Sequence, residues 1–218
     1  MMHIMEGYLP PEWAAFWYVF AIPFLVYGAL RVKRIIEEKP SMKSLIAVSA
    51  GFIFVLSALK LPSVTGSCSH PTGTGIAVVF FGPAVTALLS AIVLLYQALL
   101  LAHGGITTLG ANTASMGVIG PFVGWIAFKL LKNVNFRVAV FAAAMLSDLV
   151  TYVVTSLQLA LAFPSSAGVA GIIKSAATFM GIFAVTQVPL SIIEGVVAVM
   201  LVSYIFEVRS DVLEVVKA

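Results

Sequence analysis

Long apolar segments alternate with short polar ones along the whole chain. Apolar runs occupy residues 11–30, 44–59, 76–131, 138–163 and 175–206. A helix needs about 20 apolar residues to cross a bilayer. Four of the runs therefore predict one crossing each, and the run over 76–131 is long enough for more than one. The pattern predicts an all-α membrane protein with irregular outside loops at 61–75 and 164–174.

Basic residues form two clusters that predict the orientation of these crossings. The first is Arg31, Lys33, Arg34, Lys39 and Lys43, and the second is Lys129, Lys132 and Arg137. The positive-inside rule places both clusters in the cytoplasm. The amino terminus and the loop at 61–75 then lie outside, and the tail over 207–218 lies inside. In this arrangement His103 falls on the cytoplasmic side and does not easily reach the outside loop.

The run over 76–131 begins outside and ends inside, so it holds an odd number of crossings. Its interruptions are Gly82-Pro83, His103-Gly104-Gly105 and Gly120-Pro121. One crossing would leave too much apolar chain, so we expect three, some of them short or broken. Broken helices are tolerated where they are buried in protein or line a cavity. The total is seven transmembrane helices, and no repeat of fixed period supports an inverted-repeat carrier.

Composition points to the same class of protein. The 218 residues are 61% hydrophobic and only 10% charged, whereas soluble domains carry about 25% charged residues. We therefore expect residues 1–218 to form a single transmembrane domain. The single cysteine, Cys68, excludes an internal disulfide. No ATP-binding module is visible, so any energy that the protein needs would come from an ion gradient or a partner.

The amino end, residues 1–10, is the first candidate metal-binding segment. It does not match a secretory signal, so we expect it to be retained and exposed with a free amine. An amine, one or two backbone amides and an early imidazole form chelate rings round one ion. With the histidine third, Met1, Met2 and His3 supply four nitrogens; if translation starts at Met2 they supply three, and His70 is the candidate for the fourth. Square-planar nitrogen ligands favour Ni²⁺ or Cu²⁺, and cobalt can be accommodated.

The loop at 61–75 is the second candidate segment, because it carries Ser67-Cys68-Ser69-His70. Cys68 is either a ligand or an adjacent structural thiol, and Gly73 and Gly75 favour a simple turn. Asp148 and Glu194 lie within apolar runs, where ionisable residues are functional hypotheses by default. For these two carboxylates a structural or partner-facing role is favoured over direct metal contact.

Two other classes of function remain open at this point. A membrane metalloenzyme or copper-handling protein would use the same histidines, and a scaffold that only positions partners would bind no metal. An intramembrane hydrolase is disfavoured. All three histidines precede the candidate serines of the later runs, and no His-Glu-x-x-His zinc motif occurs.

Two motifs carry a resemblance to a known family. Met2-His3-Ile4-Met5-Glu6-Gly7-Tyr8-Leu9-Pro10 and Ser67-Cys68-Ser69-His70-Pro71-Thr72-Gly73-Thr74-Gly75 resemble the two signatures of the CbiM/NikM family. These are the substrate-binding membrane components of energy-coupling-factor (ECF) transporters for cobalt and nickel. The resemblance implies seven transmembrane helices, with the amino-terminal segment inserted into the helical core. The family begins Met-His where this chain reads Met-Met-His, which leaves open whether Met1 or Met2 supplies the amine.

The resemblance also implies a function, a site and partners. The function is high-affinity binding and uptake of Ni²⁺ or Co²⁺ for an ATP-driven transporter in the prokaryotic cell membrane, with cobalt feeding cobalamin biosynthesis. The implied partners are a coupling protein of the CbiQ/NikQ type, ATPases of the CbiO/NikO type, a small membrane protein of the CbiN/NikN type and membrane lipid, but no nucleic acid. The chain itself would not be an enzyme. The expected ligands are Met1, Met2, His3 and His70, flanked by Glu6, Cys68, Ser69 and Thr72.

Overall fold

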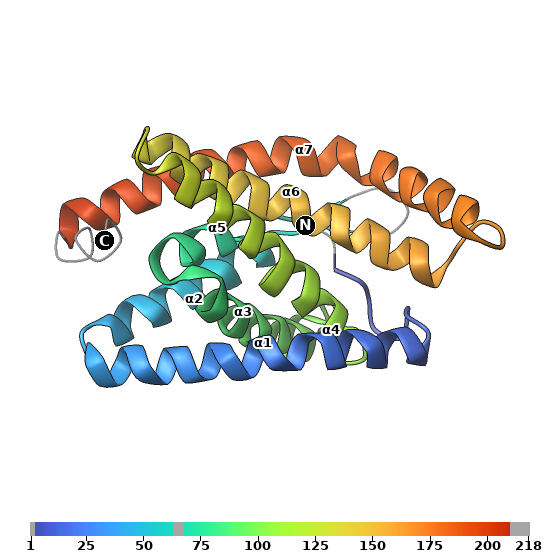
Figure 1. The fold of residues 1–218 in the computed structure, drawn as a ribbon, viewed down its shortest axis with the longest axis horizontal. Coiled ribbons are helices and arrows are strands. Elements are labelled where there is room, and N and C mark those ends of the chain that lie inside the picture. Colours follow the sequence, from blue (N-terminus) through green and yellow to red (C-terminus); the bar gives the residue numbers. More distant parts are fainter. Residues whose placement is uncertain (1–2, 63–67, 210–218) are drawn as a thin grey trace.

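The structure, a computed structural model, describes residues 3–62 and 68–209, and most of them are helical. The helices are α1 (Pro11–Glu38), α2 (Met42–Ala58), α3 (Thr74–Leu101), α4 (Leu109–Asn112), the π-helix η2 (Thr113–Ile119), α5 (Gly120–Leu131), α6 (Phe136–Ala162) and α7 (Val169–Val208) (Figure 1). Two short strands, β1 (Leu61–Pro62) and β2 (Cys68–Ser69), pair antiparallel. The expected all-α membrane fold is confirmed at this level.

Five helical stretches in the described part of the chain are long and apolar enough to cross a membrane. They are α1, α3, the continuous stretch Leu109–Leu131, α6 and α7, and the shorter apolar helix α2 adds a sixth. The protein is therefore a multi-pass membrane protein. A count of seven is reached only if α3 is divided into the parts before and after a break at Gly82. The part before Gly82 is too short to cross a membrane alone. Seven full crossings are thus not confirmed.

Helix α3 is broken at Gly82, which has φ 76° and ψ 177°. A side chain rarely adopts this conformation, and the following Pro83 cannot donate a helical hydrogen bond. A straight helix of this length, 28 residues, would be about 42 Å long. Yet the rings of His70 and His103, just outside its two ends, have centroids 4.8 Å apart. The chain therefore turns back at Gly82, and both ends of α3 return to one region of the molecule.

The third expected interruption, at Gly120-Pro121, is not a break. Leu109–Leu131 runs as one helical stretch in which η2 leads directly into α5, with Pro121 in the first turn of α5. The amide of Gly120 bonds the carbonyl of Ser115, five residues back. Such a π-helical turn changes the helical register next to a proline, which cannot make the usual bond itself. The helix thus continues through a sequence that predicts a stop.

The remaining helices enclose the folded-back α3. Helices α6 and α7 lie against each other on one side, and α1 runs along the opposite side (Figure 1). Helix α7 is a continuous helix of 40 residues that contains Pro189. The α1–α2 connection, the α5–α6 connection and the end of α7 lie at the same end of the bundle (Figure 1). Both basic clusters lie at or next to the first two connections, so they share one end, as the positive-inside prediction requires. The orientation of that end toward the cytoplasm stays a prediction.

Candidate metal centre

Three histidines from distant parts of the chain meet in the interior. His3, His70 and His103 are each at most 3% exposed. One ligand nitrogen from each ring lies within 4.8 Å of the other two. The ring centroids are 4.6 Å apart for His3 and His70 and 4.2 Å apart for His3 and His103. The amino end and the loop at 61–75 therefore meet, and a third imidazole joins them.

The hydrogen bond of His70 fixes which of its nitrogens can bind an ion. Its Nδ1 lies 2.8 Å from the backbone carbonyl of Pro71. A carbonyl oxygen only accepts, so Nδ1 carries the proton and donates. The lone pair of the neutral ring is then on Nε2. Metal-binding histidines are commonly oriented in this way, with one ring nitrogen donating to a carbonyl.

The rings of His3 and His103 form a hydrogen bond whose length also suits two ligands on one ion. Nδ1 of His3 lies 2.8 Å from Nε2 of His103. Imidazole nitrogens bind Zn²⁺ at about 2.0–2.1 Å, so two of them at a right angle would lie about 2.9 Å apart. The second nitrogen of His3, Nε2, is buried without a hydrogen-bond partner. A single ion cannot bind both nitrogens of one ring, so His3 can offer an ion either Nδ1, beside His103, or this Nε2, but not both.

Burial keeps all three rings neutral. Burial, followed by the effect of His103, lowers the pKa of His3 well below its usual value. Burial also lowers the pKa of His70. For His103, burial and then the charge of Lys60 lower the pKa to about 4. Neutral imidazole is the form that binds metal ions, so at neutral pH all three rings are in the form that could bind a cation.

Polar groups of the 103–112 region hold the amino-terminal segment in place. The side chain of Asn112 accepts from the Ile4 amide at 2.9 Å and donates to the Ile4 carbonyl at 3.1 Å. The hydroxyl of Thr108 donates to the same carbonyl at 2.7 Å. The carboxylate of Glu6 accepts from the Thr107 amide at 3.1 Å. A β-carbon on Gly105 would lie 2.5 Å from Glu6 Cα, so the segment packs directly on this glycine.

Apolar contacts add to this polar clamp. Ile4 and Leu9 are buried in a cluster with Trp17, Leu159 and Phe183. These partners belong to α1, α6 and α7, so the segment is inserted between helices of the core. Polar contacts of the Ile4 backbone and apolar contacts of Ile4 and Leu9 therefore together fix the position of the neighbouring His3.

A buried carboxylate on α7 holds the loop that carries His70. Glu194 accepts from the Thr72 amide at 2.5 Å, the Thr72 hydroxyl at 2.6 Å and the Gly73 amide at 2.8 Å. Ser69 adds a contact between its hydroxyl and that of Thr186, at 2.7 Å. Glu194 thus has the structural role that the sequence favours, but it faces the interior and not a partner protein. Gly73, with φ 71°, forms the expected turn before α3.

The other expected site residues have different outcomes. Met1 and Met2 lie outside the described residues, and the side chain of Cys68 is likewise not described. Glu6 is exposed, and its carboxylate holds the 103–108 loop. Ser69 and Thr72 bind α7 through their side chains. Their assignment to the surroundings of a metal ion stays a prediction.

The prediction for His103 is wrong. The placement of the basic residues predicts that His103 lies on the cytoplasmic side, where it does not easily reach the outside loop. The reversal occurs at Gly82 instead, which brings the end of α3 back to the amino-terminal segment. Ala102, with φ 46°, ends α3, and the His103 amide donates to the Gln97 carbonyl at 3.1 Å. The Gly82-Pro83 pair, already expected to interrupt the apolar run, is the sequence signal for this turn, but it does not show in which direction the chain continues.

Comparisons with known proteins agree with this fold. A family model described as "Cobalt uptake substrate-specific transmembrane region" matches residues 3–212. The cobalt transport protein CbiM of Acetoanaerobium sticklandii is 56% identical over 96% of this chain and 86% of that protein. The cobalt transport protein CbiM of Chlorobium limicola is 57% identical over 96% of this chain and 83% of that protein.

Solved structures show a similar fold. A crystal structure of a truncated transition metal transporter aligns with a TM-score of 0.81 and 24% sequence identity, over 94% of this chain and 99% of that chain. A second crystal structure of a transition metal transporter gives a TM-score of 0.82 at 24% identity. The family expected from the two motifs is confirmed: the chain belongs to the CbiM family of cobalt uptake substrate-specific transmembrane proteins.

Proposed function

We propose that this protein is the substrate-binding subunit of a membrane transporter for Co²⁺ or Ni²⁺. The observation that carries the proposal is the cluster of three neutral, buried imidazoles with ligand atoms within 4.8 Å of one another. Imidazole is a suitable ligand for first-row transition metals. The names of its CbiM relatives identify those proteins with cobalt transport, which favours Co²⁺ as the substrate here.

The proposed ligands are His3, His70 and His103, together with nitrogens of the amino end at Met1 or Met2. The 2.8 Å spacing of His3 and His103 supports adding His103 to the set predicted from sequence. A third imidazole allows more than the four planar ligands that the amino end and His70 would provide. The clamp on Ile4 and the bonds of Glu194 hold two of these imidazoles before an ion arrives.

The composition of the cluster favours transport over catalysis. Among the described residues, the group that could hold an ion consists of histidines alone. Glu6, the nearest carboxylate in sequence to His3, is exposed and bonded to Thr107. An enzyme would need an acid or base beside the ion. ATP-driven uptake would then depend on partners: a coupling membrane protein, cytoplasmic ATPases and a small accessory protein of the ECF type, with cobalt supplying cobalamin biosynthesis.

Metal counting on the purified chain in detergent tests this proposal. Co²⁺ and Ni²⁺ are titrated separately by equilibrium dialysis, and bound metal per chain is measured. We expect one ion per chain, with His3→Ala, His70→Ala and His103→Ala each weakening binding by more than about 100-fold, since even residues that only orient ligands contribute about 10–100-fold. Ser90→Ala, a buried polar change outside the cluster, is the control.

The amino terminus is tested in the same assay. A chain with a free amine is compared with one acetylated at the terminus. Loss of the one-to-one site on acetylation supports an amine ligand. Equal binding by both forms limits the ligands to the three imidazoles and backbone groups. Unchanged binding in all three histidine variants contradicts the proposed site altogether.

A further inference from the structure

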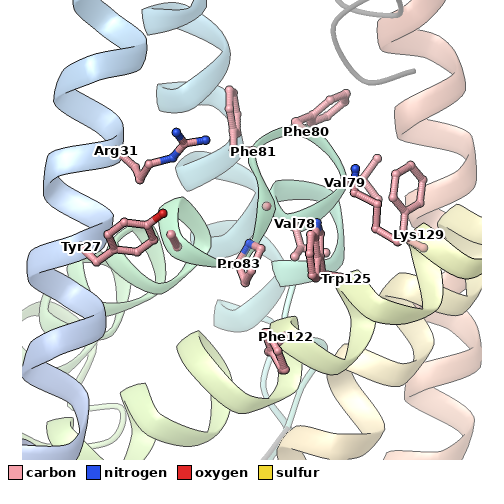
Figure 2. A pocket seen from close by; sticks show the side chains of 13 residues that line it. Tyr27, Arg31, Val78, Val79, Phe80, Phe81, Pro83, Phe122, Trp125 and Lys129 are labelled. Atoms are coloured by element: carbon pink, nitrogen blue, oxygen red, sulfur yellow. The ribbon is translucent and has the colours of Figure 1, made fainter. Parts of the chain in front are cut away.

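Two adjoining cavities open on the surface of the bundle, away from the histidine cluster. The first, about 410 Å³, lies between α1, the break in α3 and α5 (Figure 2). The second, about 460 Å³, shares Tyr27, Pro83, Ala84 and Phe122 with the first. It continues along α1 to Phe24 and Phe20. Together they form one groove that follows α1 from Arg31 to Phe20.

One end of this groove is cationic. Arg31 on α1 and Lys129 on α5 line the first cavity. Figure 2 shows their side chains reaching from opposite walls toward the broken part of α3. Within residues 3–62 and 68–209, neither forms an ion pair with an acidic side chain. The ammonium group of Lys129 lies 5.8 Å from the ring centroid of Trp125. Two positive charges thus face one cavity, and no acidic side chain in the described part of the chain pairs with them.

The rest of the groove is apolar. The second cavity is lined by aromatic and aliphatic residues of α1, α3, η2 and α5, and its lining includes Val118 and Ile119. Phe24, Tyr27 and Phe122 are each more than 40% exposed, so this wall is open to the surroundings of the bundle. In a membrane-spanning protein, those surroundings are lipid. The groove therefore has a charged end and a long apolar part, so its shape and chemistry match those of an amphiphilic molecule.

The charged end also lies at a suitable depth. Arg31 is seven residues before the end of α1, and Lys129 is two residues before the end of α5. Both helix ends lie at the end of the bundle that carries the basic clusters (Figure 1). The apolar part extends from there toward the middle of α1. This is the arrangement of a phospholipid in one leaflet, with its head group at the surface and its acyl chain pointing inward.

We propose that this groove binds one anionic phospholipid. Its phosphate lies between Arg31 and Lys129, and one acyl chain lies along Phe24 and Phe122. The planar guanidinium of Arg31 suits a phosphate, because it presents paired donors. Basic pockets between transmembrane helices are known to hold anionic head groups. A partner helix could cover the apolar wall, but a lipid also neutralises the two cations, so the lipid matches both ends of the groove.

The test uses the full chain, purified in mild detergent and exposed to phosphatidylglycerol or phosphatidylcholine. Native mass spectrometry counts the lipids retained per chain. We expect one phosphatidylglycerol to be retained on the order of tenfold more than phosphatidylcholine, because two basic contacts favour the anionic head group. The double variant Arg31→Gln/Lys129→Gln should lose this preference. Arg34→Gln/Lys43→Gln removes the same charge at the same end but outside both cavities, and should keep it.

A second measurement locates the lipid. Phosphatidylglycerol with brominated acyl chains quenches tryptophan fluorescence by contact. In a Trp13→Phe/Trp17→Phe background, Trp125 is the remaining tryptophan, and it lines the first cavity. We expect quenching at a lower mole fraction for the anionic lipid than for brominated phosphatidylcholine. Equal retention of both lipids, equal loss in the two double variants, or an absence of this quenching difference would each overturn the proposal.

Discussion

Glu194 and Thr72 are 122 positions apart in sequence, yet the carboxylate of Glu194 accepts from both the amide and the hydroxyl of Thr72. A third bond, from the Gly73 amide, completes the contact. Helix α7 thereby holds the segment that follows His70. The position of one candidate ligand is thus fixed by a helix that supplies no ligand itself.

Replacing this carboxylate should weaken metal binding without removing a ligand. In Glu194→Gln, the amide group would place a donor against a backbone donor of Thr72 or Gly73. We expect the affinity for Co²⁺ to fall about 10–100-fold, the usual effect of losing a group that orients a ligand. X-ray absorption should still count the same number of nitrogen ligands. Glu207→Gln, on an exposed position of α7, is the matched control, and an equal loss there would contradict the role of Glu194.

The clamp on the amino-terminal segment leads to a second prediction. Asn112→Ala removes a donor and an acceptor from the backbone of Ile4. We expect faster hydrogen exchange over residues 4–9 and an affinity for Co²⁺ about tenfold lower. Asn135→Ala is the control, because the Asn135 side chain caps α6 by accepting from Val138. Its loss should cost about 1 kcal/mol of stability but leave metal affinity unchanged. If Asn112→Ala binds normally, the apolar contacts of Ile4 and Leu9 are sufficient.

The neutral histidines predict how the stability of the metal-free protein depends on pH. His103 has a folded-state pKa of about 4, whereas an unperturbed histidine has a pKa of about 6.5. Between these values the unfolded chain binds more protons, so stability falls as the pH falls. Above about pH 6.5 the ring is neutral in both states, and this contribution is constant.

Thermal melting in detergent without metal checks this dependence. We expect the melting temperature to decrease from about pH 6.5 toward pH 4, the window set by the two pKa values. His103→Gln removes one of the three titrating rings and should reduce the slope. An unchanged slope in that variant would show that His103 is not the group responsible.

The turn in α3 gives a fourth prediction. Gly82→Ala places a β-carbon at φ 76° and ψ 177°, a conformation that costs a side chain about 1–3 kcal/mol. We expect a loss of stability of that size, measured by chemical unfolding in detergent. Gly181→Ala is the control, because Gly181 lies within α7 and an added β-carbon there meets no atom within 4 Å. It should be neutral or stabilising by about 0.5–1 kcal/mol. Equal effects of the two substitutions would argue against a strained turn at Gly82.

Much of the fold could be predicted from local sequence properties. The apolar runs gave the positions of α1, α2, α6 and α7 to within a few residues at most ends, because a membrane helix must satisfy its backbone internally and expose apolar side chains. Basic residues identified the two connections that lie at one end of the bundle. The expected break at Gly120-Pro121 did not occur, because a π-helical turn accommodates the proline.

The candidate site was predictable only in part. Its two motifs identified His3 and His70, because histidines beside polar loops are unusual in so apolar a chain. His103 was missed because Gly82-Pro83 marks an interruption of the apolar run, but a chain that continues across the membrane after this interruption and one that turns back have the same composition. Only the direction of the chain after Gly82 distinguishes them, and that direction depends on packing against other helices.

The sequence by itself determined that this is a helical membrane protein, and that polar residues suited to binding a metal ion gather at its amino end and in the loop before α3. The tertiary structure alone decided which residues meet. It brought His103 to His3 across 100 positions and Glu194 to Thr72 across 122. The physical reason is that membrane helices of similar hydrophobicity can be arranged in many ways. The arrangement is selected by buried hydrogen bonds, close contacts and turns between residues far apart in the chain.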